Sequence, residues 1–167
     1  MNAELLKSIN NPFRFALFLL VKLPIGFLAG LRLVQATPTQ AVVCIKYQYI
    51  TKNPFHSIYF GCLAMAAELA SGTLGLVYSM GLFPEVSMLV VHMEADFIKK
   101  GKGRVYFTCT DGEMLGQAAR ETRATGESRT VIATSIGRDI NGFEIARFKI
   151  TWSFKAKLVK TPQQRSA

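Results

Sequence analysis

Glu68 is the only carboxylate in the segment 58–80, an apolar stretch that contains no Lys, Arg or His. An acid in apolar surroundings is poorly hydrated, so its charged form is disfavoured and it becomes a stronger base than it is in water. Such a group could activate a water molecule or attack a substrate itself. Glu68 is therefore the leading candidate for a catalytic residue. The alternative is a structural carboxyl that is hydrogen-bonded inside the protein, for example to Ser71 or Asn53, without a part in catalysis.

Several polar residues lie near this carboxylate in the sequence and could serve the same site. Asn53 and His56 could orient a substrate or a water molecule, although an Asn before Pro and a lone His are also common in local structure. Ser57 stands where the N-cap of a helix belongs. Ser71 and Thr73 could hydrogen-bond a water molecule near the carboxylate, or could bond back to their own helix.

A basic turn lies further along the chain. Lys99, Lys100, Lys102 and Arg104 bring four positive charges within six residues. This cluster would suit the phosphate groups of a ligand, and the alternative interpretation is a solvated hairpin.

A possible metal site lies on the strand before that turn, where His92, Glu94 and Asp96 share one face. Three ligands on one flat strand seldom converge on a metal ion, so we predict an exposed polar face and no metal.

Composition indicates one folded domain with part of its surface covered. The chain has 167 residues, of which 50% are apolar and 19% charged, which argues against disorder. Its net charge of +9 is unevenly distributed, because residues 61–98 contain four acids and no Lys or Arg. A basic protein can bind nucleic acid, an anionic membrane or a phosphate-bearing ligand. Nucleic acid is the least favoured of the three, because no strand interleaves basic and aromatic residues.

Location and redox state follow from the same composition. Cys44, Cys62 and Cys109 lie in apolar runs without the spacing of a disulfide framework or a metal site, so we expect reduced thiols in the core. The N-terminus lacks the pattern of a secretory signal, which favours a cytoplasmic location.

The apolar segment 13–34 is interrupted by Arg14, Lys22 and Arg32 and broken by Pro24. Its longest uncharged run is nine residues, whereas a spanning helix needs about 20. We expect an N-terminal helix, at about 4–30, that packs its apolar side on a domain covering 1–156. A helix lying on a membrane surface is the less favoured alternative. Residues 157–167 should form a flexible polar tail.

Alternation of apolar and polar residues predicts strands after the first helix. The strands are expected at 41–49, 88–98, 103–110, 129–136 and 143–154, with a buried helix at about 58–80 and a short helix or irregular excursion at 113–123. A helix that is apolar on every side must be enclosed. The order therefore predicts an α+β fold in which a curved antiparallel sheet wraps around one long central helix.

Several short motifs carry a resemblance to a known family. They are Asn11-Pro12-Phe13, Gly30-Leu31-Arg32, Asn53-Pro54, Ser57-Ile58-Tyr59-Phe60-Gly61, Ala67-Glu68-Leu69 with Gly72, and Asn141-Gly142 running into Trp152. Over residues 11–154 the chain resembles the hotdog-fold acyl-CoA thioesterases, most closely the phenylacetyl-CoA thioesterase type. Relatives begin the central helix with His-Gly-Gly and carry Asp or Glu seven residues after the second Gly. Gly61 and Glu68 match this spacing, whereas Tyr59 and Phe60 replace the His and the first Gly.

The resemblance implies hydrolysis of a thioester, which needs a group that polarises the carbonyl and a base that brings in water. The free amides of Phe60 and Gly61 at the helix start could polarise the carbonyl, and Tyr59 could offer its hydroxyl where relatives have His. Seven helical residues place Glu68 about 10 Å from Gly61, too far for both to act on one carbonyl from one helix. A homodimer, or a dimer of dimers, with the site between protomers would solve this, and the resemblance implies the same.

The functional expectation is therefore an acyl-CoA or acyl-carrier thioesterase, with no cofactor, in which Glu68 is base or nucleophile. Coenzyme A would place its phosphates at the basic turn. The alternative is a non-catalytic module that binds acyl chains or lipid, in which Tyr59 and Phe60 have closed the catalytic pocket.

Overall fold

The computed structural model describes residues 1–157 and contains five α-helices and a short 3-10 helix in that part of the chain. The helices are α1 (Ala3–Ile9), α2 (Pro12–Lys22), α3 (Pro24–Leu28), α4 (Phe60–Ser79) and α5 (Gly112–Thr125), with the 3-10 helix η1 at Tyr49–Thr51. The strands are β1 (Arg32–Ala36), β2 (Ala41–Lys46), β3 (Val86–Phe97), β4 (Arg104–Cys109), β5 (Arg129–Asp139) and β6 (Glu144–Ala156).

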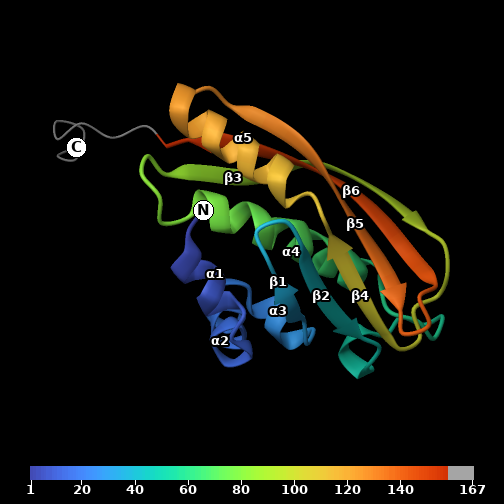
Figure 1. Cartoon of the computed structure of the whole chain (residues 1–167). Helices are drawn as coiled ribbons and strands as arrows, with labels where there is room; N and C mark the ends of the chain where they lie inside the picture. The colour runs from blue at the N-terminus through green and yellow to red at the C-terminus, as the bar shows by residue number, and fades with distance from the viewer. Residues whose placement is uncertain (158–167) are drawn as a thin grey trace, which may run out of the picture.

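The strands form one antiparallel sheet in the order β1-β2-β4-β5-β6-β3. The sheet curves around α4, which runs along its concave side (Figure 1). Apolar residues at alternate positions of β2, β4 and β6 are buried, as the sequence predicts. In β6 they are Ala146, Phe148, Ile150, Trp152 and Phe154, all buried. The predicted α+β arrangement of one sheet around one central helix is therefore confirmed.

The helix α4 is long and apolar enough to span a membrane by composition alone. In the fold, however, most of its residues are buried by the sheet and the other helices. Small residues allow this close wrapping. A methyl group built on Gly72, for example, would come within 3.2 Å of the Trp152 ring.

The N-terminal region differs from the expected single helix at 4–30, because it forms three helices and then a strand. Asn11 begins α2 as an N-cap, accepting hydrogen bonds from the amides of Phe13 and Arg14. Pro24 opens α3, and proline is tolerated at a helix start but not within one. Gly30 then has a φ of 73°, which ends the helical segment before β1.

Asn10 joins the first helix to the edge of the sheet. Its side-chain amide donates to the carbonyl of Ala36 and its side-chain oxygen accepts from the Ala36 amide, both at 2.8 Å. These bonds satisfy backbone groups at the end of β1. We expect Asn10→Ala to lower the free energy of unfolding by about 1–3 kcal/mol, because part-buried backbone groups lose their partners. Urea denaturation would measure this, and Asn141→Ala, in an exposed hairpin, is the control.

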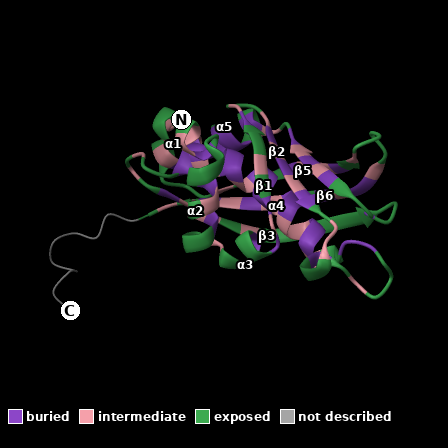
Figure 2. Cartoon of the chain, turned by 90° about the horizontal axis from the view of Figure 1, so that it is seen from below, coloured by how far each residue is buried: buried purple, intermediate pink, exposed green. Residues whose placement is uncertain are grey.

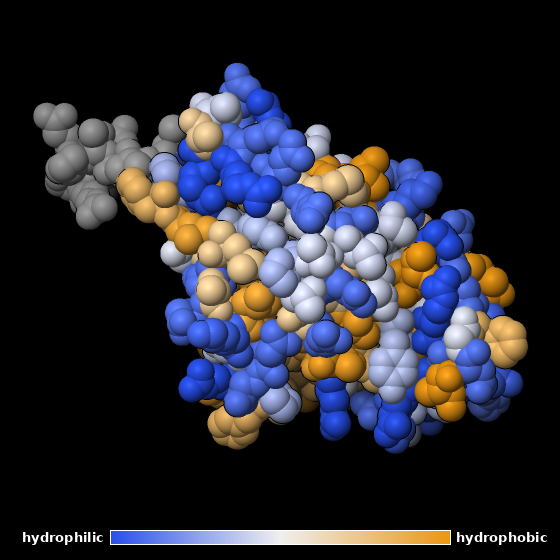
Figure 3. All heavy atoms as spheres, in the orientation of Figure 1, coloured by the Kyte–Doolittle hydropathy of each residue, from blue (hydrophilic) through white to orange (hydrophobic). Residues whose placement is uncertain are grey.

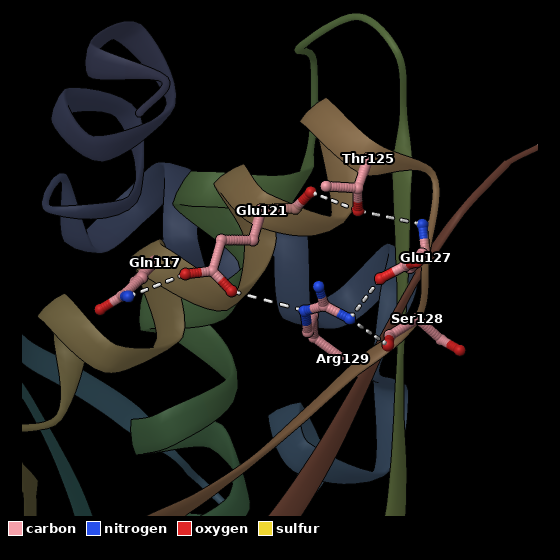
Figure 4. Close-up of polar contacts among 6 residues, drawn as sticks. All are labelled: Gln117, Glu121, Thr125, Glu127, Ser128 and Arg129. Carbon is pink, nitrogen blue, oxygen red and sulfur yellow. Dashed lines mark hydrogen bonds and ion pairs between the residues drawn. The ribbon is translucent and has the colours of Figure 1, made fainter.

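The excursion expected at 113–123 is the helix α5, which packs beside α4 and β5. Its C-terminus is fixed to β5 by a polar cluster (Figure 4). Arg129 contacts the carboxylates of Glu121 at 3.4 Å and Glu127 at 2.9 Å. Gln117 donates to Glu121 at 2.8 Å, and Gly126 ends the helix in the left-handed conformation.

Two local expectations are wrong. Ser57 is not the N-cap of the central helix, which begins at Phe60 after Tyr59. The hydroxyl of Ser57 instead donates to Asn53, because the backbone between them turns before the helix starts. Lys157, expected in the loose tail, is bound to Glu85 through its backbone amide and its ammonium, both at 2.8 Å. The remainder of the predicted tail, 158–167, lies outside the described residues.

Candidate active site

Glu68 lies on α4 beside a partly open apolar pocket of about 270 Å³. The walls come from α1, α2, α4, β3 and β6, elements that are distant in the sequence. They are Ile9, Phe15, Phe18, Lys22 and Leu23 from the N-terminal helices, Leu69, Gly72, Thr73 and Leu76 from α4, Met88 from β3 and Trp152 from β6. The carboxylate is thus covered by the N-terminal helices, and the pocket reaches the edge strand β3.

Burial in this pocket raises the pKa of the Glu68 carboxyl above its ordinary value. The cause is desolvation of the carboxylate. Within residues 1–157 the carboxylate forms no hydrogen bond or ion pair that would offset this effect. A buried acid without a partner is costly to keep charged. It is therefore available to a water molecule or a ligand rather than engaged in holding the fold.

Ser71 and Thr73 bond to their own helix. The hydroxyl of Ser71 donates to the carbonyl of Glu68 at 3.1 Å and accepts from the indole of Trp152 at 3.0 Å. The hydroxyl of Thr73 donates to the carbonyl of Leu69 at 2.6 Å. Of the two interpretations that the sequence leaves open, the structure shows the bond back to the helix, and Ser71 also fixes the indole beside Glu68.

The start of α4 presents two amides without an acceptor in the described part of the chain, those of Phe60 and Gly61. The Tyr59 ring lies against Gly61, since a methyl group built there would come within 2.7 Å of the ring. Tyr59 and Phe60 also pack together, with ring centroids 4.7 Å apart. Both side chains are about half exposed, so the aromatic pair lies at the surface beside the helix start.

A second cleft of about 410 Å³ borders this helix start. It is lined by Phe60 and Leu63 of α4, Phe97 of β3, and the loop residues Asn53, Phe55, Ser57, Ile58, Ile98, Lys99, Lys100 and Gly101. Of the predicted site residues near the helix start and in the basic turn, Asn53, Ser57, Phe60, Lys99 and Lys100 share this cleft, whereas His56, Tyr59 and Gly61 do not line it. Glu68 lines the other pocket, so one chain by itself does not bring it to the amides of Phe60 and Gly61.

Asn53 has a structural role in this cleft. Its side-chain oxygen accepts from the amides of Phe55 and Ser57 and from the hydroxyl of Ser57, at 3.0 to 3.2 Å. His56 follows with an exposed side chain and a φ of 57°, a left-handed conformation. These bonds shape the loop before α4.

The basic turn is divided in space. Lys100 donates to the carbonyl of Phe55 at 3.3 Å, and the Lys99 ammonium lies 4.0 Å from the centre of the Phe143 ring. Arg104 lies elsewhere, in a small cleft on the outside of β1, β2 and β4 that also contains Arg32 and Lys46. Lys102 is exposed and lines neither cleft.

The polar face of β3 is exposed. Glu94 lies 3.4 Å from His92 and 3.8 Å from Lys149 on the neighbouring strand β6. Asp96 is exposed on the same strand, opposite Arg147. These carboxylates have cationic neighbours, as expected of a polar surface.

Sequence reasoning missed the wall that α2 builds over Glu68. Phe15, Phe18 and Lys22 follow a helical spacing on α2, but nothing in the sequence says which distant residue they cover. Trp152 also lines this pocket, and no pattern in the sequence predicts its hydrogen bond to Ser71 beside the candidate base. The alternation of apolar and polar residues in β6, which points Trp152 inward, is the only sequence signal for this placement.

Comparison with known proteins identifies the architecture. No family model matches the chain, and no curated protein matches its sequence. Among solved structures it is similar to a protein of unknown function from Pseudomonas aeruginosa described as a probable thioesterase, with a TM-score of 0.73 and 21% identity, covering 87% of this chain and 97% of that one. It is also similar to a putative thioesterase from Shewanella oneidensis, with a TM-score of 0.71 and 11% identity, covering 92% and 99% of the two chains.

A thioesterase from Haemophilus influenzae has a TM-score of 0.64 and 14% identity, covering 86% of this chain and 91% of that one. These structures match a six-stranded antiparallel sheet wrapped around a central helix. The chain has the hotdog fold. The identities are low enough that the likeness extends to the fold alone.

Within this hotdog domain, the buried acid should reduce stability at neutral pH. A raised folded-state pKa means that the native state binds the Glu68 proton more tightly than the unfolded chain does. Stability is therefore lost as the pH rises from the ordinary value of 4.5 through the folded-state pKa. We expect Glu68→Gln to raise the melting temperature by a few degrees at neutral pH, with no gain below pH 4.5.

Thermal denaturation across pH measures this difference. The control is Glu113→Gln, a solvent-exposed glutamate of α5 that should give no comparable gain. A Glu68→Gln protein that is less stable than the original at neutral pH would mean that the carboxylate holds the fold together.

Proposed function

We propose that the protein is a thioesterase that hydrolyses acyl thioesters of coenzyme A or a carrier protein. The observation that carries this proposal is Glu68, a carboxylate without a partner among residues 1–157, whose pKa is raised by burial in an apolar pocket of a hotdog domain. Perturbed acids of this kind concentrate at functional sites. Similar solved structures described as thioesterases add support.

In the proposed reaction, the Glu68 carboxylate takes a proton from a water molecule as that water attacks the thioester carbonyl. The amides of Phe60 and Gly61 donate to the carbonyl oxygen as it becomes negative. The C–S bond then breaks, the proton passes to the departing thiolate, and a carboxylic acid and a thiol are released. No cofactor is needed.

The site would lie between two protomers, because Glu68 and Phe60, which begins the helix, line different pockets of one chain. The strand β3 supports pairing with a second copy, since it is an edge strand of 12 residues with exposed apolar side chains. Long apolar edge strands pair with other chains unless they are protected. The opposite edge, β1, has only five residues and is bound by Asn10.

Two-fold pairing of β3 would also join the two half-sites. Met88, near one end of β3, lines the Glu68 pocket, and Phe97, at the other end, lines the cleft at the helix start. Antiparallel pairing over the whole strand would place Val86 opposite Phe97 of the partner subunit. Each Glu68 pocket would then lie beside the partner's helix-start cleft.

Release of free thiol from a panel of short, long and aromatic acyl-CoA substrates tests this function. We expect turnover of at least one acyl class. If the protein hydrolyses none of these acyl-CoA substrates and no acyl-carrier-protein thioester, the proposed thioesterase function is rejected.

The second candidate is a non-catalytic module that binds acyl chains. The contact of the Tyr59 ring with Gly61 favours it, because an aromatic pair packs at the helix start where a carbonyl would have to bind. Binding of a fluorescent fatty acid by a protein that hydrolyses no thioester would support this function. Replacing Tyr59 and Phe60 together by His and Gly would then be expected to expose the helix start.

A further inference from the structure

The first part of the chain has an unusual charge distribution. Residues 5–67 contain six Lys and Arg residues but no Asp or Glu. This segment includes α2, α3, β1 and β2, which lie together on the lower side of the molecule in Figure 1. Any surface that it forms is positive, with no carboxylate of its own to neutralise it.

The helix α2 has two apolar faces, and only one is used by the domain. Phe15 and Leu19 point inward and are buried. Phe13, Leu17, Leu20 and Val21 point outward and are exposed, with 79% of Phe13 and 65% of Val21 accessible. Their spacing of four, three and one residues places them on one side of the helix.

The helix α3 extends this exposed side. Ile25 and Leu28 are both 61% exposed. In the view from below, exposed turns of α2 and α3 lie near one another (Figure 2). We call six of the exposed apolar side chains of these two helices, Phe13, Leu17, Leu20, Val21, Ile25 and Leu28, the docking face. Figure 3, in the orientation of Figure 1, shows apolar and hydrophilic residues interspersed over the side of the molecule that it presents.

Unpaired cations border the docking face. Arg14 and Lys22 are exposed on α2, and Arg32, Lys46 and Arg104 line the small outer cleft beyond α3. Strand pairing holds the three cations of the outer cleft close together, since Arg32 lies opposite Cys44 on β2 and Lys46 lies opposite Arg104 on β4. None of the five forms an ion pair within residues 1–157, whereas Arg129, Arg138 and Arg147 all do.

The helices α2 and α3 and the basic cleft adjoin one another. A groove between α2, α3 and β1 is lined by Phe15, Phe27, Leu31 and Arg32, among others, and Gly30 and Arg32 also line the basic cleft. An apolar helix face bordered by cations is the pattern of a helix that lies in the interface of a bilayer, where apolar side chains enter the lipid and cations contact phosphates.

We propose that the docking face binds the surface of an anionic phospholipid bilayer. The charge complementarity favours lipid over a second copy of the chain. An isologous dimer through this face would bring Arg14 and Lys22 of each copy toward the same cations of the other, without a carboxylate from residues 5–67 to separate them. A bilayer rich in phosphatidylserine supplies the missing negative charge.

The inner side of α2 gives this docking a functional consequence. Phe15, Phe18 and Lys22 line the pocket that holds Glu68, so docking would hold that pocket next to the lipid surface. Acyl chains that partition into the bilayer would reach it over a short path. The docking itself does not depend on whether Glu68 is catalytic.

Vesicle sedimentation of the full-length protein tests the proposal. We expect the protein to pellet with vesicles of phosphatidylcholine and phosphatidylserine, to bind pure phosphatidylcholine vesicles weakly, and to be released by high salt. The double variant Leu17→Glu/Val21→Glu should bind at least about tenfold more weakly, because two charges would enter the apolar interface. Arg14→Gln should weaken binding only to the anionic vesicles.

The matched control is Met114→Glu, which places one charge at an exposed apolar residue of α5, on the upper side of the molecule in Figure 1. It should bind as the original protein does. Circular dichroism and melting temperature verify that each variant is folded. Equal binding by the Leu17→Glu/Val21→Glu variant, equal binding to both kinds of vesicle, or no pelleting at all would overturn the proposal. Light scattering that shows this variant losing a subunit would instead assign the docking face to a second copy.

Discussion

We expect Glu68→Gln to reduce thioester hydrolysis by a factor of at least about 100, because a positioned general base contributes about 10²–10⁴ to the rate. Glutamine has nearly the same shape but cannot accept the proton of the attacking water. Within residues 1–157 the Glu68 carboxylate holds no other group, so the variant should fold normally and isolate the chemical step. The measurement is kcat and KM for the best substrate of the acyl-CoA panel.

The pH dependence of the original enzyme gives a second readout. A general base must be deprotonated, so kcat/KM should rise with pH through the pKa of Glu68, which burial places above the ordinary carboxyl value. Glu68→Asp should retain part of the activity, since it keeps the carboxylate but shortens the side chain. Glu113→Gln, on the exposed side of α5, should have the original rate. Equal rates for the Glu68→Gln protein and the original would exclude this residue as the base.

The central part of the fold could be predicted from sequence because its residues carry strong local signals. The run from Phe60 to Ser79 has no polar side, so a buried helix was expected within two residues of each observed end. Alternation in β4 and β6 identified the strands and their buried faces. Such patterns depend only on neighbouring residues, which is why they were sufficient.

The N-terminal region could not be predicted in the same way. Arg32–Ala36 forms a strand only because it pairs with β2, and its burial does not alternate. Asn10 and Asn11 divide the expected helix because one bonds to the distant Ala36 and the other caps α2. These bonds are tertiary or depend on the exact point at which a helix restarts, so the composition of the segment did not reveal them.

The surroundings of the candidate site could be predicted only in part. Glu68 stood out as a lone charge, but its pocket is completed by Phe15 and Phe18, more than 40 residues earlier in the chain. The sequence also grouped Arg104 with Lys99 and Lys100, because all belong to one turn. The chain enters β4 at Arg104 and turns that side chain toward Arg32 and Lys46, away from the cleft. Residues that are close in sequence therefore need not share a site where a loop passes into a strand.

We expect Leu89→Lys/Val91→Lys, a double change in β3, to convert the protein to a monomer and to abolish hydrolysis. Leu89 and Val91 are exposed on the edge strand, and lysine there is a device by which natural sheets prevent pairing between edges. Because the proposed site needs Glu68 of one protomer and the free amides of the other, loss of pairing should remove activity without changing either group. Light scattering gives the mass and the acyl-CoA assay gives the rate.

The control for this variant is Ile132→Lys on β5, an internal strand with neighbours on both sides. Ile132 and Val91 have similar exposure, 55% and 52%, so both changes place a charge at a solvent-facing apolar position. Only the change on the edge strand should affect assembly. A monomeric Leu89→Lys/Val91→Lys protein with the original rate would show that a single chain holds a complete site. A dimer with the original rate would place the subunit contact on a surface other than β3.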